Sequence, residues 1–146
     1  MAPGVDESVS KTPKMAPQGS RFDQRMTWCR TRADVEGAWS WGEMRQWTDD
    51  EWTCTIHCDL THLSASTWGE IDQMSSGSAH KMHHAHELVD LVEEAQDRWI
   101  ERDLEQFDTV FRFRIGGQKR RAWGFIVQAH FHLVWWEREH NIYPVE

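Results

Sequence analysis

Apolar residues recur at three- and four-residue steps between residues 52 and 74, the spacing of one face of an α-helix. Thr48 and Glu51 stand just before this pattern as a capping box, in which a hydroxyl and a carboxylate bond the first amides of a helix. The first stripe is Trp52, Ile56, Leu60 and Leu63. Residues 64–67 can end this helix and cap another, with an inner face of Trp68, Ile71 and Met74. Two short helices in succession are predicted.

A longer apolar stripe follows residues 80–86, which we expect to be extended. Its members are Leu88, Leu91, Val92, Ala95, Trp99, Ile100 and Leu104. The charged residues of this stretch lie mostly on the other side of a helical projection, which is typical of an amphipathic helix. The pattern therefore predicts one long helix that packs on a flat apolar surface.

The last third of the chain has three short apolar runs of the length of β-strands. Residues 110–115 alternate apolar side chains with Arg112 and Arg114, and Gly116-Gly117 permits a tight hairpin. Residues 122–127 and 131–136 give two further strands, with a turn near Gln128, and residues 39–41 suit a short half-buried strand. The predicted fold class is α+β, with two short helices and one long amphipathic helix packed on a C-terminal antiparallel meander of three to four strands.

The composition suggests one domain with a tail. Residues 1–25 contain Pro3, Pro13 and Pro17 and few apolar side chains, so we expect a flexible N-terminal tail followed by a single α+β domain at residues 26–146. No run of about 20 apolar residues is present, and no membrane partner is expected. The three cysteines have spacings that do not suggest disulfides, which favours a reducing cytoplasm.

The charge and the tryptophans bear on possible partners. The net charge of −8 disfavours broad binding to nucleic-acid backbones, although residues 107–146 hold six Lys and Arg against four acids. Most of the ten tryptophans should lie in a core or an interface. Trp135 and Trp136 must point to opposite faces of their strand, so we expect one in the core and the other exposed or covered by a partner. These two residues and Trp123 are the predicted partner-binding residues.

The end of the chain resembles a known group of proteins. Residues 120–125, 131–136, His140 and Tyr143-Pro144 resemble a family of short uncharacterised proteins of actinobacteria, their phages and other mobile elements. Members often have Asp-Pro where this chain has Glu137-Arg138, so the turn after the last strand can differ. The resemblance implies a mobile-element origin and a cytoplasmic location in a bacterial host.

The order of helices and strands also resembles that of the RelE-like toxins, in which helices precede a terminal antiparallel meander. That resemblance implies cleavage of messenger RNA on the ribosome. Arg112, Arg114 and Arg121 would then stabilise the phosphorane, while His140, Glu139 or Tyr143 would transfer protons.

Two groups of residues have the donor chemistry of metal ligands. His80, His84 and His86 would share one face of an extended chain, where they could bind a transition metal. A second possible ligand set on a helix is Cys54, His57, Cys58 and His62. The chain has no phosphate-loop, dinucleotide or zinc-protease motif, so no cofactor is predicted.

Three functions are thus predicted. The first is a protein-interaction module that binds a host or cognate partner protein, or a second copy of the chain as a homodimer, through an acidic, Trp-rich surface. The second is a RelE-like endoribonuclease, and the third is a metal-binding protein that uses the histidine cluster. The second would be favoured if Arg112, Arg114, Arg121 and His140 converged in one concave site.

Overall fold

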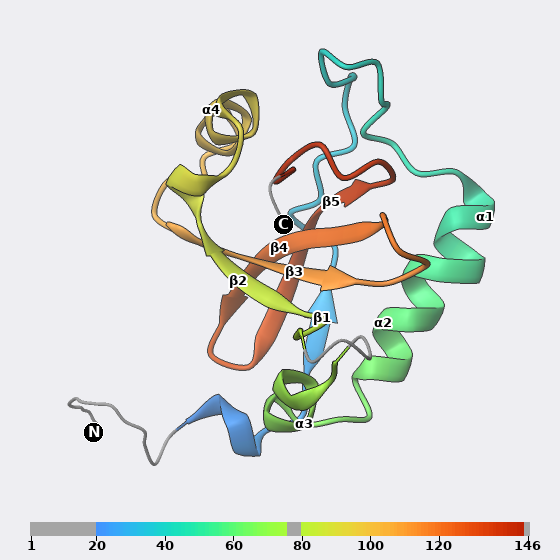
Figure 1. Cartoon of the computed structure of the whole chain (residues 1–146), viewed down its shortest axis with the longest axis vertical. Helices are drawn as coiled ribbons and strands as arrows, with labels where there is room; N and C mark the ends of the chain where they lie inside the picture. Colours follow the sequence, from blue (N-terminus) through green and yellow to red (C-terminus); the bar gives the residue numbers. More distant parts are fainter. Residues whose placement is uncertain (1–19, 76–79, 145–146) are drawn as a thin grey trace.

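A five-stranded mixed sheet forms the centre of the protein, in a computed structural model that describes residues 20–75 and 80–144 (Figure 1). The strand order is β1-β5-β4-β3-β2. The strands are β1 (Thr27–Cys29), β2 (His84–Glu87), β3 (Thr109–Arg114), β4 (Arg121–Val127) and β5 (His130–Glu137). Neighbouring strands are antiparallel except for β1 and β5, which are parallel.

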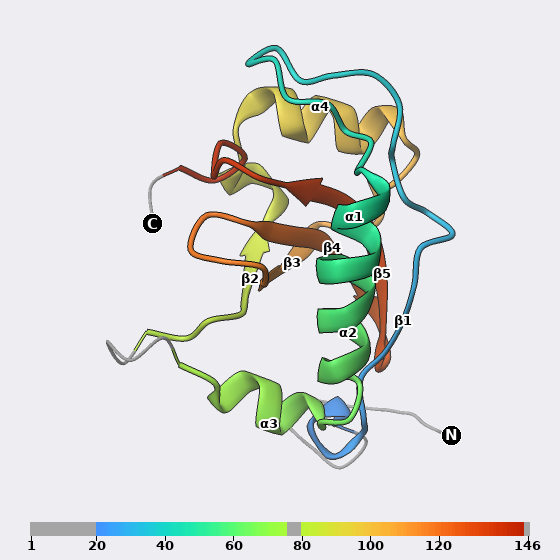
Figure 2. The ribbon, with the colours of Figure 1, turned by 90° about the vertical axis from the view of Figure 1, so that its right-hand side faces the viewer.

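One long helix crosses a face of the sheet (Figure 2). It comprises α1 (Asp49–Glu51), the π-type turn η2 (Trp52–Ile56) and α2 (His57–Leu63), 15 residues in all. The predicted capping box is confirmed, because the Glu51 amide donates to the Thr48 hydroxyl at 3.0 Å and the Thr48 amide donates to the Glu51 carboxylate at 2.8 Å. A second capping box at Thr67 starts α3 (Trp68–Gln73).

The shorter elements are α4 (Glu93–Glu101) and the 3-10 turns η1 (Arg21–Asp23) and η3 (Leu88–Asp90). No helix in the part of the chain described above is both long enough and apolar enough to cross a bilayer.

The sheet is covered on both faces, and each face has its own core. Phe113, Phe131 and Trp136 pack against the long helix and α3 on one face. Val110, Phe125 and Trp135 pack against α4 and Trp39 on the other. Successive residues of β3 and β4 therefore enter different cores, as the pleat of a strand requires, whereas the irregular register of β4 and β5 places the neighbours Val134 and Trp135 in the same core.

The adjacent tryptophans differ from expectation. Trp135 and Trp136 point to opposite faces as predicted, but each is only 1% exposed, and Trp123 is also 1% exposed. The expectation that one of the pair lies exposed or under a partner is therefore wrong, because each face of the sheet has a helical layer from the same chain.

The predicted fold class is wrong in the placement of its helices. The 15-residue helix is the one expected to be short, whereas the predicted long helix is the nine-residue α4. Leu91 and Val92 have extended backbones, and the chain leaves the helix at Asp103, whose φ is 63°. The apolar stripe at residues 88–104 arises because a 3-10 turn, a short helix and the chain beyond them all contribute to one core.

The predicted sheet is also wrong. The three consecutive antiparallel strands β3, β4 and β5 exist, but β2 pairs with β3 on one edge and β1 pairs with β5 on the other. The sheet is thus mixed and is not a C-terminal meander. Residues 39–41 form a turn, in which Trp39 packs edge-on against Trp135.

The N-terminal boundary is partly described. Of the predicted tail, residues 1–19 lie outside the described residues. Residues 20–25 include η1, and Gln24 accepts a hydrogen bond from the Trp68 amide at 2.9 Å. This short segment therefore contacts the start of α3.

Candidate functional site

A basic pocket of about 560 Å³ opens on the α4 side of the sheet, near β2 and the β3–β4 hairpin. Its lining residues are His80, Lys81, His84, His86, Arg112, Arg114, Arg121 and Tyr143. Within the described ranges, none of the residues that line it is acidic. We call it the basic pocket.

The pleat and the strand register bring these residues together. Arg112 and Arg114 follow Val110 on the same face of β3, and Val110 lies in the core beneath α4. Across the ladders, His84 pairs with Arg112 and Arg121 pairs with Arg114. The basic pocket is therefore the continuation of the α4 face beyond the part that α4 covers.

Backbone carbonyls orient two of the guanidinium groups. Arg112 is 3% exposed and donates to the Met82 carbonyl at 3.1 Å. Arg121 is 5% exposed and donates to the carbonyls of Gln118, at 2.6 Å, and Arg120, at 3.0 Å. Arg114 is more accessible than either, so it is the guanidinium that a ligand can reach most easily.

The electrostatic effect of this cluster is visible at His83. Burial, and after it the positive charges of Arg112 and other nearby basic groups, lower the pKa of His83 to about 4. Its imidazole is consequently neutral near pH 7, and Nδ1 accepts a hydrogen bond from the Arg114 amide at 3.1 Å. Burial disfavours any charge, but the positive charges of Arg112, Arg114 and Arg121 that add to this shift favour an anion nearby.

Aromatic and imidazole rings line the other side of the basic pocket. The Tyr143 ring lies 4.2 Å from the His86 ring, and His86 lies 5.8 Å from His84, measured between centroids. The pocket therefore combines groups that bind anions with groups that can accept or donate protons.

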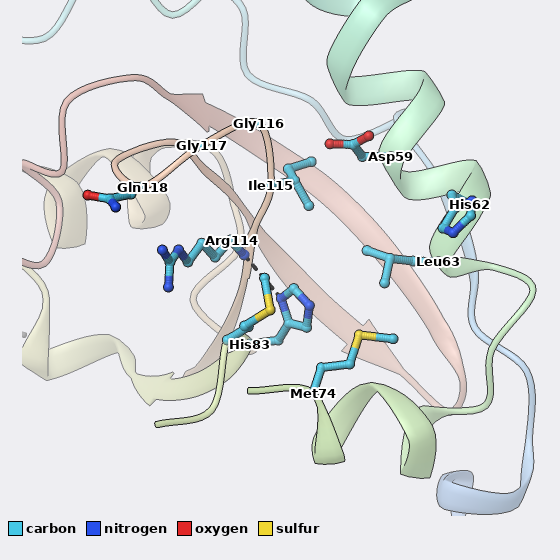
Figure 3. A pocket seen from close by; sticks show the side chains of 11 residues that line it. Asp59, His62, Leu63, Met74, His83, Arg114, Ile115, Gly116, Gly117 and Gln118 are labelled. Carbon is cyan, nitrogen blue, oxygen red and sulfur yellow. Dashed lines mark hydrogen bonds between the residues drawn. The ribbon is translucent and has the colours of Figure 1, made fainter. Parts of the chain in front are cut away.

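A second pocket of about 380 Å³ adjoins the first at Arg114, which lines both. Figure 3 shows it between α2, α3 and the β3–β4 hairpin, with Leu63, Met74 and Ile115 as apolar walls. The Arg114 guanidinium lies toward Gln118, away from Asp59 and Leu63 (Figure 3). An apolar surface thus lies next to a cationic one.

The structure groups the predicted catalytic residues only in part. Arg112, Arg114, Arg121 and Tyr143 all line the basic pocket, whereas His140 is not among its lining residues. His140 stands after β5 with a φ of 55°, and Glu139 lies at the surface, 3.6 Å from Lys119. Trp123, Trp135 and Trp136 are buried and line no wall of this pocket.

The predicted metal sets differ from what the fold arranges. His80, His84 and His86 line the basic pocket, but among the described residues they are not a group whose three ligand atoms lie at metal-binding distances. On the long helix, Cys54 and Cys58 are exposed, and the His57 ring packs on those of Trp28 and Trp52.

Sequence reasoning missed two residues near the site. Lys81 lines the basic pocket, and His83 lies beneath it with its ring against Phe113. The signal that could have identified His83 is its position next to His84, because successive residues of an extended segment face opposite sides.

Comparison of the chain with protein-family models, with curated proteins and with solved structures finds no match. The resemblances to the mobile-element family and to RelE-like toxins stay predictions, and the geometry of the basic pocket is the basis for a function.

Proposed function

We propose that this protein is an RNA-binding endoribonuclease whose active site is the basic pocket. The observation that carries the proposal is the convergence of Arg112, Arg114 and Arg121 with three imidazoles and a phenol in one concave site. Backbone phosphates are the ligands that arginines bind with paired, charge-assisted hydrogen bonds.

The reaction is attack of a ribose 2′-oxygen on the adjacent phosphorus. A bond forms between the 2′-oxygen and phosphorus, the bond from phosphorus to the 5′-oxygen breaks, and a 2′,3′-cyclic phosphate remains. The negative charge on the phosphoryl oxygens grows in the transition state. Arginines fixed in position before the reaction stabilise that charge without reorganisation.

Two protons must move in this step. A neutral imidazole, from His84 or His86, accepts the proton of the 2′-hydroxyl. The other imidazole, as imidazolium, or Tyr143 returns a proton to the departing 5′-oxygen. Imidazoles suit these roles because their ordinary pKa of about 6.5 lies near neutral pH.

The second pocket gives the RNA a place for a base. Its Leu63, Met74 and Ile115 walls are apolar, and it meets the basic pocket at Arg114. A nucleotide can therefore place its base on the apolar side while its phosphate contacts the arginines. Single-stranded RNA, whose bases are free to leave a stack, is the substrate that fits this arrangement.

The acidic remainder of the chain limits the extent of the contact. With a net charge of −8, the protein repels phosphates outside the basic pocket. If three arginines contact phosphates, the slope of log K against log salt concentration for a single strand should be about −2. A much steeper slope would indicate a broader nucleic-acid surface.

The hypothesis of a protein-interaction module has no contact residues left among the predicted tryptophans, because Trp123, Trp135 and Trp136 are each 1% exposed. No other observation on the described surface identifies a partner protein. We therefore place RNA cleavage ahead of it.

The test uses fluorescein-labelled single-stranded RNA and the full chain. Arg114→Gln should weaken binding about tenfold, as expected for the loss of one hydrogen bond between charged groups. Lys119→Gln is the matched control, since it removes the same charge from an exposed neighbour outside the pocket lining. Equal affinities of the two variants would overturn the proposed binding site.

Cleavage is tested separately on denaturing gels. The double variant His84→Ala/His86→Ala should retain RNA binding and lose cleavage, and wild-type products should end in a cyclic phosphate. An oligonucleotide of the same sequence with 2′-deoxyribose at each position lacks the attacking 2′-hydroxyl, so it should bind and remain intact. Tight RNA binding by the wild type without any cleavage would refute the nuclease and leave an RNA-binding protein.

A further inference from the structure

The parallel pair of β1 and β5 aligns four polar side chains, a hydroxyl, a thiol and two imidazoles, at one edge of the sheet. Thr27 pairs with His130, and Cys29 pairs with His132. Residues two apart on a strand share a face, so all four side chains lie on the same side of the sheet. They belong to segments more than one hundred residues apart in the sequence.

The distances within this cluster are short. Cys29 Sγ lies 3.4 Å from His132 Nδ1, and the rings of His130 and His132 are 4.8 Å apart at 77°. Sγ of Cys29 and one nitrogen of each imidazole all lie within 4.8 Å of one another. Among the described residues, this is the one group of three or more such side chains that meets this condition.

We propose that Cys29, His130 and His132 bind a zinc ion. One thiolate and two imidazoles are the donors that zinc prefers. Bond lengths of about 2.3 Å to sulfur and 2.0 Å to nitrogen at a tetrahedral angle separate the two ligand atoms by about 3.5 Å. The separation of 3.4 Å between Cys29 Sγ and His132 Nδ1 matches this value. A movement of the His130 ring toward the other two groups completes the set.

Neighbouring groups orient the proposed ligands. His130 Nδ1 is hydrogen-bonded to the Thr27 hydroxyl at 2.7 Å, which leaves Nε2 for the metal. The His132 ring stacks on Phe125 with centroids 4.6 Å apart and planes at 6°.

The cluster is accessible and separate from the basic pocket. Cys29, His130 and His132 are each half-buried, so an ion can enter from solvent. Three protein ligands leave the fourth tetrahedral position to water, which is the pattern of zinc sites that bind a further ligand. The site lies between β1 and β5, whereas the basic pocket is built on β2, β3 and β4, so the two proposals can be tested independently.

The experiment is a titration of the metal-free, reduced full chain with Co²⁺, followed by displacement with Zn²⁺. We expect one equivalent of Co²⁺ with tetrahedral d–d absorption and a thiolate-to-cobalt charge-transfer band, both removed by zinc. Cys29→Ser should abolish the charge-transfer band and weaken zinc binding at least about 100-fold, beyond the effect of losing an outer-shell partner. Thr27→Val should weaken it about tenfold.

Two variants serve as matched controls. Cys54→Ser/Cys58→Ser removes the exposed cysteines of the long helix, and His84→Ala alters the histidine cluster of the basic pocket. Both should keep the charge-transfer band. Circular dichroism of each metal-free variant reports folding, and His132→Gln provides a second ligand variant if Cys29→Ser does not fold.

Three results would overturn the site: no thiolate band in the wild type, a band that survives Cys29→Ser and His132→Gln, or a band lost with Cys54 and Cys58. The first would leave the contact between Cys29 and His132 as a thiol–imidazole hydrogen bond.

Discussion

Asp34 is the residue whose substitution best tests the packing of the α4 face. It is 0% exposed and accepts two hydrogen bonds of 2.7 Å from Arg98 on α4 and one of 3.0 Å from the Trp135 indole on β5. Nitrogen atoms of Arg45 and Arg102 lie 3.7 and 3.8 Å from its oxygens. A single carboxylate thus joins the segment after β1 to α4 and to the sheet.

Asp34→Asn keeps the size of the side chain and removes its charge. The new amide must present either a donor or a weaker acceptor to the two Arg98 donors. Hydrogen bonds between charged groups contribute about 1.5–3 kcal/mol each, and removal of one partner of a buried ion pair costs about 3–5 kcal/mol. Because the Arg98 side chain is 16% exposed and partly hydrated, we expect a loss near the lower end, about 3 kcal/mol.

The assay is urea unfolding at pH 7, followed by tryptophan fluorescence and circular dichroism. Glu36→Gln is the control, because it removes the same charge from a side chain that is 75% exposed and paired with Arg102. The control should change the free energy of unfolding by less than about 0.5 kcal/mol. A loss below about 1 kcal/mol for Asp34→Asn would refute the reasoning.

The pH dependence gives a second check on Asp34. Burial acts to raise its pKa, but the hydrogen bonds from Arg98 and Trp135 outweigh burial, and the pKa is lowered. The stabilisation by Asp34 is therefore present above the unfolded-state pKa of about 3.9 and is lost as the pH falls through the lower folded-state value. The difference in stability between wild type and Asp34→Asn should shrink below about pH 4.

Other substitutions test separate parts of the fold by the same unfolding assay. Trp99→Ala should cost about 3–5 kcal/mol, since the indole is fully buried and donates to the Phe107 carbonyl, and a near-neutral effect would contradict its core position. Gly124→Ala should cost at least about 1–3 kcal/mol, because its Cβ would stand 2.0 Å from the His132 carbonyl oxygen; unchanged stability would show that the β4–β5 bulge can relax. Thr67→Ala should cost about 1 kcal/mol through loss of the α3 capping box, compared with a smaller effect of Thr61→Ala in the exposed part of α2. Burial raises the pKa of Glu137 despite hydrogen bonds from Trp123 and the Ile142 and Asn141 amides, so its contribution to stability falls as the pH rises from about 4.3 through the raised value. Glu137→Gln should remove that slope, and an unchanged pH profile would contradict it.

Local signals in the sequence determined several elements correctly. The capping box at Thr48 and the possible caps at residues 64–67 identified the starts of two helices, and Gly116-Gly117 identified the β3–β4 hairpin. Period-two alternation identified β3, and short apolar runs between turns identified β4 and β5. These features could be read from the chain because each depends on residues within a few positions of one another.

The lengths of the helices and the edges of the sheet could not be read in this way. An apolar stripe indicates which residues are buried but not the backbone that buries them. Residues 88–104 contribute to one core through a 3-10 turn, a short helix and a turn. β1 has three residues, too few for a period, and its pairing with β5 depends on contacts across the whole chain.

The candidate sites show the same division. The alternation of Arg112 and Arg114 placed both on one face of β3, but only the ladder register set Arg121 and His84 beside them. The cluster of Cys29, His130 and His132 exists because a parallel pair joins the first strand to the last. The sequence by itself determined the chemistry each segment carries, through local spacing and capping. The tertiary structure determined which of these functional side chains lie together, because contacts between distant strands are set by the packing of two cores and not by neighbouring residues.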